Sequence, residues 1–188
     1  MNKPKNKFAD KLVFVKEVLK HPLKMGAALP SSPQLAKAMA AQVHANTNDA
    51  ILELGPGTGI VTRALIARGF AKQLNLVEFS ENFVTYLKTN LSEIPVFHGS
   101  ALELNTLLPK DKLFNTVVSS LPLRLFNQEQ LAILWQQIND VMQKDGLFIQ
   151  FSYLPFYQSF VIPNFSLKTV KTIWQNLPPA RVYVYQKS

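Results

Sequence analysis

An acidic residue two positions before three alternating glycines is the most informative chemical feature of this sequence. The four residues are Glu53, Gly55, Gly57 and Gly59. The apolar run before them predicts a buried strand and the residues after them predict a helix, so the glycines let a ligand approach the backbone at the carboxyl end of a sheet. A dinucleotide-binding turn needs glycine or alanine where Ile60 stands, and we therefore expect a different ligand.

A second acidic residue, Glu78, closes the next apolar run. A carboxylate at the end of a second strand can accept hydrogen bonds from both hydroxyls of a ribose. Phe79 follows it and can pack on the face of an adenine ring. Together with the glycine turn, Glu78 predicts a nucleoside ligand.

The acid-and-glycine turn resembles motif I of the class I S-adenosylmethionine-dependent methyltransferases. The resemblance implies S-adenosylmethionine as cofactor, S-adenosylhomocysteine as product and no metal, with Glu53 meeting the methionine ammonium directly or through water. Ser100 stands where many of these enzymes have Asp, so the adenine contact falls to its hydroxyl or to the neighbouring backbone. The expected cofactor-binding residues are Ser31, Glu53, Gly55, Gly57, Gly59, Glu78, Phe79, Ser100, Ala101 and Leu102.

The segment Val118-Ser-Ser-Leu-Pro-Leu123 follows the fourth expected strand, where amino-group methyltransferases present acceptors to the incoming nitrogen. Enzymes that methylate a flipped adenine have Asn or Asp at the position of Ser120 and an aromatic residue at the position of Leu123, which accept from the base and stack on it. Both are replaced here, which favours a substrate other than a planar base.

The chain as a whole resembles the bacterial phospholipid N-methyltransferases, which methylate phosphatidylethanolamine stepwise towards phosphatidylcholine. The segments that carry the resemblance are the Lys-rich start, residues 21–32, 53–59, 119–123 and 176–182. Among them, the Ser-Leu-Pro segment and the Asn176-Leu-Pro-Pro179 turn discriminate most, because the glycine turn establishes only the superfamily.

The implied reaction needs a neutral amine as nucleophile. Burial disfavours the ammonium form, and a nearby acceptor takes the proton. The expected catalytic residues are Ser119 and Ser120, with Tyr153 as a polar wall, although a Tyr in an aromatic run also fits simple packing. Arg124 and Arg181 are expected to pair with a lipid phosphate or to be solvated.

The composition predicts one domain with one core. The chain has 188 residues, of which 47% are hydrophobic and 17% charged, and it has no Cys, which excludes disulfide scaffolds, zinc fingers and cysteine nucleophiles. Strands expected at 50–54, 73–78, 94–98, 115–119 and 147–152 alternate with helices at 33–43, 60–68, 80–90 and 127–142. This order predicts a Rossmann-like α/β fold whose mostly parallel, seven-stranded sheet has helices on both faces. Segments 166–175 and 180–186 are expected to add an antiparallel hairpin.

The formal net charge of +8 is concentrated at the two ends of the chain. Residues 1–24 hold seven Lys against Asp10 and Glu17, and no acidic residue follows Asp145. Phe8, Leu12, Val15 and Leu19 share one face of an expected first helix, and the residues expected to meet lipid around it are Lys7, Lys11, Phe14 and Lys16. No apolar run reaches the roughly 20 residues of a membrane span. We expect residues 1–24 to bind an anionic membrane or to pack on the sheet, and residues 25–188 to form the methyltransferase domain of a cytoplasmic, monomeric enzyme on the inner face of the plasma membrane.

Two other functions fit parts of the sequence. An enzyme similar to the ribosomal-RNA adenine dimethyltransferases would share the glycine turn, but such enzymes usually carry a C-terminal helical domain, whereas this chain ends where the sheet is expected to close. No stacking aromatic residues are expected among the N-terminal lysines, because Phe8 and Phe14 belong to the apolar side of the expected helix, so nucleic acid is not the expected partner. A non-catalytic binding module on a degenerate fold is the third reading, and the intact acids and glycines count against it.

Overall fold

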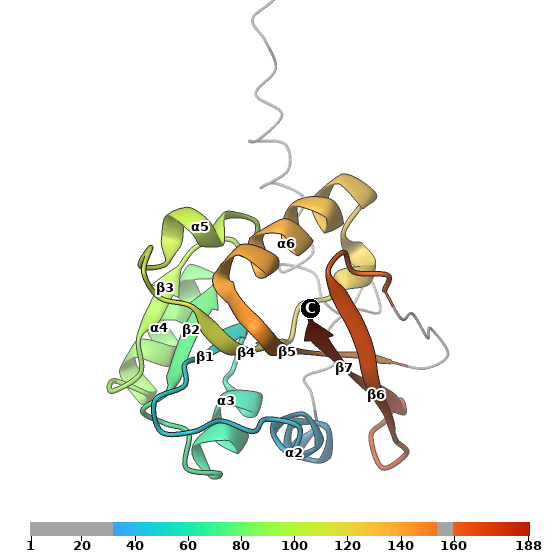
Figure 1. The fold of residues 1–188 in the computed structure, drawn as a ribbon. Helices are drawn as coiled ribbons and strands as arrows, with labels where there is room; N and C mark the ends of the chain where they lie inside the picture. Colours follow the sequence, from blue (N-terminus) through green and yellow to red (C-terminus); the bar gives the residue numbers. More distant parts are fainter. Residues whose placement is uncertain (1–31, 154–159) are drawn as a thin grey trace, which may run out of the picture.

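A computed structural model describes residues 32–153 and 160–188. The described residues form a seven-stranded sheet in the order β3-β2-β1-β4-β5-β7-β6 (Figure 1). The strands are β1 Ile51–Leu54, β2 Leu74–Glu78, β3 Val96–His98, β4 Phe114–Ser119, β5 Met142–Tyr153, β6 Phe165–Ile173 and β7 Ala180–Lys187. Strands β1 to β5 pair in parallel, and β7 runs antiparallel between β5 and β6. The predicted fold, including its C-terminal hairpin, is confirmed.

Helices cover both faces of the sheet (Figure 1). They are α2 Pro33–Ala40, α3 Ile60–Ile66, α4 Glu81–Asn90, the short α5 Leu104–Leu107 and α6 Gln128–Val141, with 3₁₀ turns η1 Ala101–Glu103 and η2 Leu123–Leu125. Helix α2 begins where the Ser32 hydroxyl accepts from the Leu35 N–H, and α6 begins with a capping box between Asn127 and Gln130.

Two apolar clusters lie on opposite faces of the sheet. One packs α2 and α3 on the strands through residues such as Met39, Leu65 and Val118. The other packs α6 on them through residues such as Leu134 and Phe148. Every residue of β1 and β2 is buried, as expected for parallel strands covered on both sides. The clusters fix the carboxyl ends of the strands, where the cavity described below lies.

The start of β5 differs from the sequence prediction. The strand begins at Met142, directly after α6, and not at residue 147. Phe114 of β4 pairs with Met142 while Thr116 pairs with Leu147, so residues 143–146 form a bulge in which Asp145 has a φ of 61°. Helix α2 also ends earlier than predicted, at Ala40. At α2 the apolar pattern continues past the end of the helix, whereas at β5 the polar residues 143–145 hide the early start of the strand.

The predicted first helix lies outside the described residues. Lys7, Lys11, Phe14, Lys16 and Ser31 therefore remain predictions, as does the division at residue 24. Between residues 32 and 188, within the described ranges, no helix combines the length and apolar character that crossing a bilayer requires.

Candidate active site

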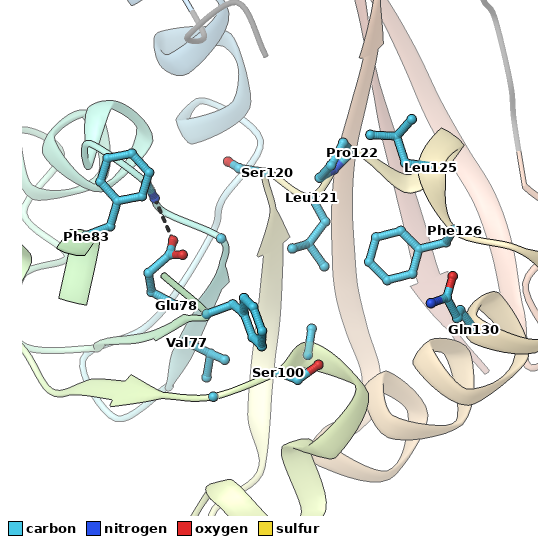
Figure 2. Close-up of a pocket in the computed structure, with 15 residues that line it drawn as sticks. Val77, Glu78, Phe83, Ser100, Ser120, Leu121, Pro122, Leu125, Phe126 and Gln130 are labelled. Atoms are coloured by element: carbon cyan, nitrogen blue, oxygen red, sulfur yellow. Dashed lines mark hydrogen bonds between the residues drawn. The ribbon is translucent and has the colours of Figure 1, made fainter. Parts of the chain in front are cut away.

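A cavity of about 750 Å³, counting the solvent at its mouth, lies across the carboxyl ends of β1, β2, β3 and β4 (Figure 2). One side, here named the cofactor half, is lined by Gly55, Gly57, Val77, Glu78, Phe79, Phe83, Gly99, Ser100 and Ala101. The other side, named the reaction half, is lined by Ser120, Leu121, Pro122, Leu125, Phe126 and Gln130. The topology thus brings the glycine turn and the Ser-Leu-Pro segment to one cavity, as the parallel order of their strands predicts.

The glycine turn needs glycine for its backbone conformation and for its close contacts. Gly55, Gly57 and Gly59 have φ values of 67°, 55° and 74°. A Cβ on Gly55 would come within 3.0 Å of Leu121 Cδ2, whereas a Cβ on Gly57 would meet nothing within 4 Å. The backbone at Gly57 is therefore open on the side that lines the cavity, which fits close approach of a ligand.

Glu78 connects the glycine turn to the start of α4. Its carboxylate is buried, and its Oε2 accepts from the Gly57 N–H at 3.0 Å (Figure 2). Its Oε1 accepts from the Ser80 N–H at 2.8 Å. Each carboxylate oxygen can accept more than one hydrogen bond, so both keep acceptor capacity. This geometry fits the predicted contact with two ribose hydroxyls.

Glu53 is fully buried in the middle of β1, beneath the glycine turn. Neither of its oxygens has a hydrogen-bond partner among residues 32–153 and 160–188. Burial, with a smaller contribution from the Glu78 charge, raises the pKa of Glu53 to about 8, although Thr62 and Arg63 offset part of the rise. Although Thr62 is close enough to lower that pKa, its hydroxyl does not reach hydrogen-bonding geometry with the carboxylate. Glu53 does not line the described cavity, and its unpaired carboxylate fits a cationic partner reached directly or through water.

The side of the cofactor half where the adenine contact was expected is built on η1. The Ser100 hydroxyl accepts from the Leu102 N–H at 3.1 Å and so caps this turn. Ser100, Ala101 and Phe79 line the cavity, whereas Leu102 does not. The Ser100 hydroxyl is thus already bonded to the backbone. Because Ala101 lines the cavity and Leu102 does not, Ala101 is better placed to contact a ligand.

Hydrogen bonds to β1, to β5 and within the loop itself hold the Ser-Leu-Pro segment in place. The Ser120 N–H donates to the Leu54 carbonyl at 2.9 Å, and the Ser119 hydroxyl accepts from the Leu121 N–H at 3.3 Å. The Leu121 carbonyl accepts from the Leu123 N–H at 2.9 Å and from Gln150 Nε2 at 3.1 Å. Since a carbonyl oxygen has two lone pairs, that carbonyl has no acceptor capacity left.

Ser120 and Ser119 differ in what their hydroxyls do. The Ser120 hydroxyl is buried and has no hydrogen-bond partner among the described residues, and Ser120 lines the cavity, whereas the Ser119 hydroxyl is used inside the loop. Gln150, which is buried in β5 and donates to the loop, was not among the predicted site residues. Its only sequence signal was a polar residue in the apolar run 147–151.

Three predicted residues lie away from the cavity wall. Tyr153, at the end of β5, stacks edge-on with Phe151 and packs against the cluster under α2. Arg181 donates from Nε to the Thr172 hydroxyl at 3.3 Å, and Arg124 is exposed in η2 next to the lining residues Pro122 and Leu125. Within residues 32–153 and 160–188, no three His, Asp or Glu side chains gather as metal ligands would.

A family model described as a methyltransferase domain matches residues 51–146, which hold the glycine turn, Glu78 and the Ser-Leu-Pro segment. The chain belongs to this methyltransferase family. The predicted resemblance to class I methyltransferases is confirmed. All the residues that line the two halves of the cavity lie within the matched range.

Relatives and solved structures agree with this family. The methyltransferase chain is 27% identical to an ornithine lipid N-methyltransferase of Singulisphaera acidiphila, over 93% of this chain and 94% of that one. A structure of the methyltransferase yhhF from Escherichia coli superposes with a TM-score of 0.63 at 19% identity, covering 86% of this chain and 89% of that one. The glycopeptide N-methyltransferase MtfA, solved with S-adenosylhomocysteine, has a TM-score of 0.64 at 12% identity, covering 92% and 97%. At these identities the two structures establish the shared fold.

The reaction half of the cavity is mostly apolar. Leu121, Pro122, Leu125 and Phe126 line it, and Ser120 and Gln130 supply its polar groups. Gln130 Oε1 already accepts from the Asn127 N–H in the capping box. An amine in such a place favours its neutral form, because low polarity disfavours a charged ammonium.

Proposed function

We propose that the chain transfers methyl groups from S-adenosylmethionine to the amine of phosphatidylethanolamine and of its mono- and dimethyl forms, towards phosphatidylcholine. The observation that carries the proposal is one cavity with two unlike halves: Gly57 and Glu78 on one side, and Ser120 within an apolar surface on the other. The similarity to a lipid N-methyltransferase over nearly the whole chain supports a lipid amine as acceptor.

The residues of the cofactor half fit S-adenosylmethionine. Glu78 has acceptor capacity for the ribose hydroxyls, Gly57 leaves its backbone open, and the unpaired Glu53 carboxylate fits the methionine ammonium. Phe79 supplies an apolar ring for the adenine. When bound, the cofactor supplies a methyl group carried on a positively charged sulfur.

The residues of the reaction half prepare the amine. Their apolar side chains lower the pKa of an entering ammonium by disfavouring its charge, so that it gives up a proton more readily. The Ser120 hydroxyl, which has no partner, can accept a hydrogen bond from the amine and orient its lone pair. The bonds to the Leu121 carbonyl keep this loop in place, and fixed positioning supplies much of the rate enhancement in such transfers.

The protein is proposed to act as a monomer bound peripherally to the inner face of the plasma membrane. The basic residues of segment 1–24 support an anionic membrane as the partner, since each Lys near such a surface contributes about 1 kcal/mol. Arg124, exposed near the reaction half, is proposed to face the lipid phosphate. A polar-wall role for Tyr153 and a phosphate contact for Arg181 have less support, because neither lines the cavity.

Ornithine lipid is a second candidate acceptor, because the relative from Singulisphaera acidiphila is named for it. Both lipids present a primary amine, so the cavity chemistry accommodates either. The test incubates the protein with methyl-labelled S-adenosylmethionine and, separately, with vesicles of phosphatidylethanolamine, vesicles of ornithine lipid, or ribosomal subunits. We expect label in phosphatidylethanolamine. Label in ornithine lipid alone would mean that ornithine lipid, and not phosphatidylethanolamine, is the acceptor. Label in RNA alone would overturn the proposal of lipid methylation.

A further inference from the structure

The turn between β6 and β7 exposes two large apolar side chains. Trp174 is 71% exposed and Leu177 is 88% exposed. Leu167 and Val170 are also exposed, further along the edge strand β6. Isolated exposed apolar residues are ordinary, but a tryptophan and a leucine that are both mostly exposed on one short turn indicate a surface that meets a partner.

This turn lies on the same side of the sheet as the cavity, where the parallel strands have their carboxyl ends. Ala180, at the start of β7, pairs with Tyr153 at the carboxyl end of β5, and β5 is parallel to β4, whose carboxyl end leads into the reaction half. Strand β7 is two positions from β4 in the sheet, a separation of about 10 Å. A flat partner that covers the turn is therefore close to the cavity as well.

The start of α2 is attached to the same turn. The Ser32 N–H donates to Asn176 Oδ1 at 3.4 Å, and the buried Asn176 side chain also donates to the Pro178 carbonyl. Figure 1 shows α2 beside the end of the β6–β7 hairpin where this turn lies. The described part of the chain therefore begins next to the turn that carries Trp174 and Leu177.

The charge of the hairpin favours an anionic partner. Lys171 on β6 and Arg181 on β7 are the basic residues of the hairpin nearest the turn, and no acidic residue follows Asp145. Lysines on an edge strand also disfavour pairing with a second copy of the strand, so the pattern argues against a dimer through β6. Tryptophan beside basic residues suits the boundary between lipid headgroups and acyl chains, where its ring is buried and its N–H stays in a polar layer.

We propose that the β6–β7 turn is a membrane-docking surface that inserts Trp174 and Leu177 into the headgroup region of an anionic bilayer. The inference rests on the proposed lipid substrate, because it explains how a cavity at the sheet edge reaches an amine in a bilayer. It adds a contact within the folded domain to the one expected of residues 1–24.

Intrinsic fluorescence gives a direct test, because the chain has two tryptophans and the other, Trp135 on α6, is buried against the rings of Phe148 and Phe160. In Trp135→Phe, emission reports on Trp174 alone; if that variant folds poorly, the difference between wild type and Trp174→Phe gives the same signal. Vesicles of phosphatidylethanolamine and phosphatidylglycerol (3:1) should shift the emission to the blue, and brominated acyl chains should quench it. Unchanged emission on vesicle-bound protein would overturn the proposal, as would strong protection from acrylamide before lipid is added, which would mean that another part of the chain covers Trp174.

A charge-insertion pair gives the second test. Trp174→Glu/Leu177→Glu should weaken sedimentation with these vesicles by about tenfold or more, the factor that corresponds to 1.4 kcal/mol. The matched control is Leu113→Glu, since Leu113 is 46% exposed but precedes β4 at the opposite edge of the sheet, and it should bind vesicles as wild type does. Equal binding by all three proteins would overturn docking through the turn. A change of oligomeric state in the double variant would instead identify an interface between copies and would also overturn it.

A soluble substrate separates this inference from the proposed function. Short-chain phosphatidylethanolamine below its micellar concentration needs no docking, so wild type and the double variant should methylate it equally. If wild type methylates it and the double variant still binds vesicles normally, the docking surface is wrong and the function stands. If wild type methylates no soluble or vesicular lipid amine, the proposed function fails, whatever the vesicle binding shows.

Discussion

The Gly57 N–H donates to Glu78 Oε2 at 3.0 Å and so joins the ends of β1 and β2 across the cofactor half. The acid proposed to bind the ribose is thereby held by the turn proposed to admit the cofactor. Because the Ser80 N–H holds the other oxygen, the carboxylate is oriented before any ligand arrives. This preorganisation reduces the ordering that binding would otherwise require.

Glu78→Gln should weaken S-adenosylmethionine binding by roughly tenfold to a hundredfold, because hydrogen bonds to a charged group contribute about 1.5–3 kcal/mol. Calorimetry measures this affinity directly, and vesicle sedimentation should not change. Equal losses of cofactor and vesicle binding would point to a damaged fold and contradict the ribose assignment.

Glu53 should make the unliganded protein less stable as the pH rises. Its folded pKa of about 8 lies above the usual value of 4.5, so the folded state holds a proton that the unfolded state releases. The stabilisation is complete below 4.5 and is lost as the pH rises through about 8, with a slope of at most about 1.4 kcal/mol per pH unit. Urea unfolding at several pH values, for wild type and Glu53→Gln, isolates the effect.

The comparison for Glu53 uses the slope and not the absolute stability, because a buried Gln adds donors of its own. The variant should lose the part of the pH dependence between 4.5 and 8 that wild type shows. Parallel curves for the two proteins would mean that the carboxyl is not protonated in the folded state.

Ser120→Ala should slow lipid methylation by about tenfold or more while leaving the melting temperature unchanged, because the hydroxyl that it removes has no partner in the fold. Ser119→Ala is the matched control. It removes the acceptor of the Leu121 N–H, and an unsatisfied buried donor costs about 1–3 kcal/mol, so it should lower the melting temperature. A fully active Ser120→Ala would exclude the hydroxyl from the mechanism.

Gln150→Met should lower kcat with little change in KM for lipid or in cofactor affinity, because it removes the amide that holds the Leu121 carbonyl without altering the cavity lining. Gln73→Met makes the same change directly before β2, at the amino ends of the strands and away from the cavity. This control variant should leave kcat unchanged. If both variants behave alike, Gln150 does not position the loop.

The sequence predicted the fold well because its strands are short, apolar and separated by clear turn signals. Gly55 and Glu78 could be placed at one site from strand order alone, since parallel strands end at the same edge. The β5 bulge at residues 143–146 could not be predicted, because its exposed polar residues look like a loop.

The roles of individual polar groups were harder to predict. That Gln150 and not another residue saturates the Leu121 carbonyl depends on side-chain packing across three strands. Likewise, the difference between Ser119 and Ser120 arises from which hydroxyl faces the loop backbone, and two adjacent serines do not reveal this by their type.

The most direct test of a shared cavity for cofactor and lipid amine is mass spectrometry of lipid recovered after incubation with trideuteromethyl-S-adenosylmethionine and phosphatidylethanolamine vesicles. We expect deuterated methyl groups on the headgroup nitrogen, made by wild type and strongly reduced in Glu78→Gln. If the protein binds both the cofactor and the vesicles and the recovered lipid is still unlabelled, the shared cavity for cofactor and lipid amine is contradicted.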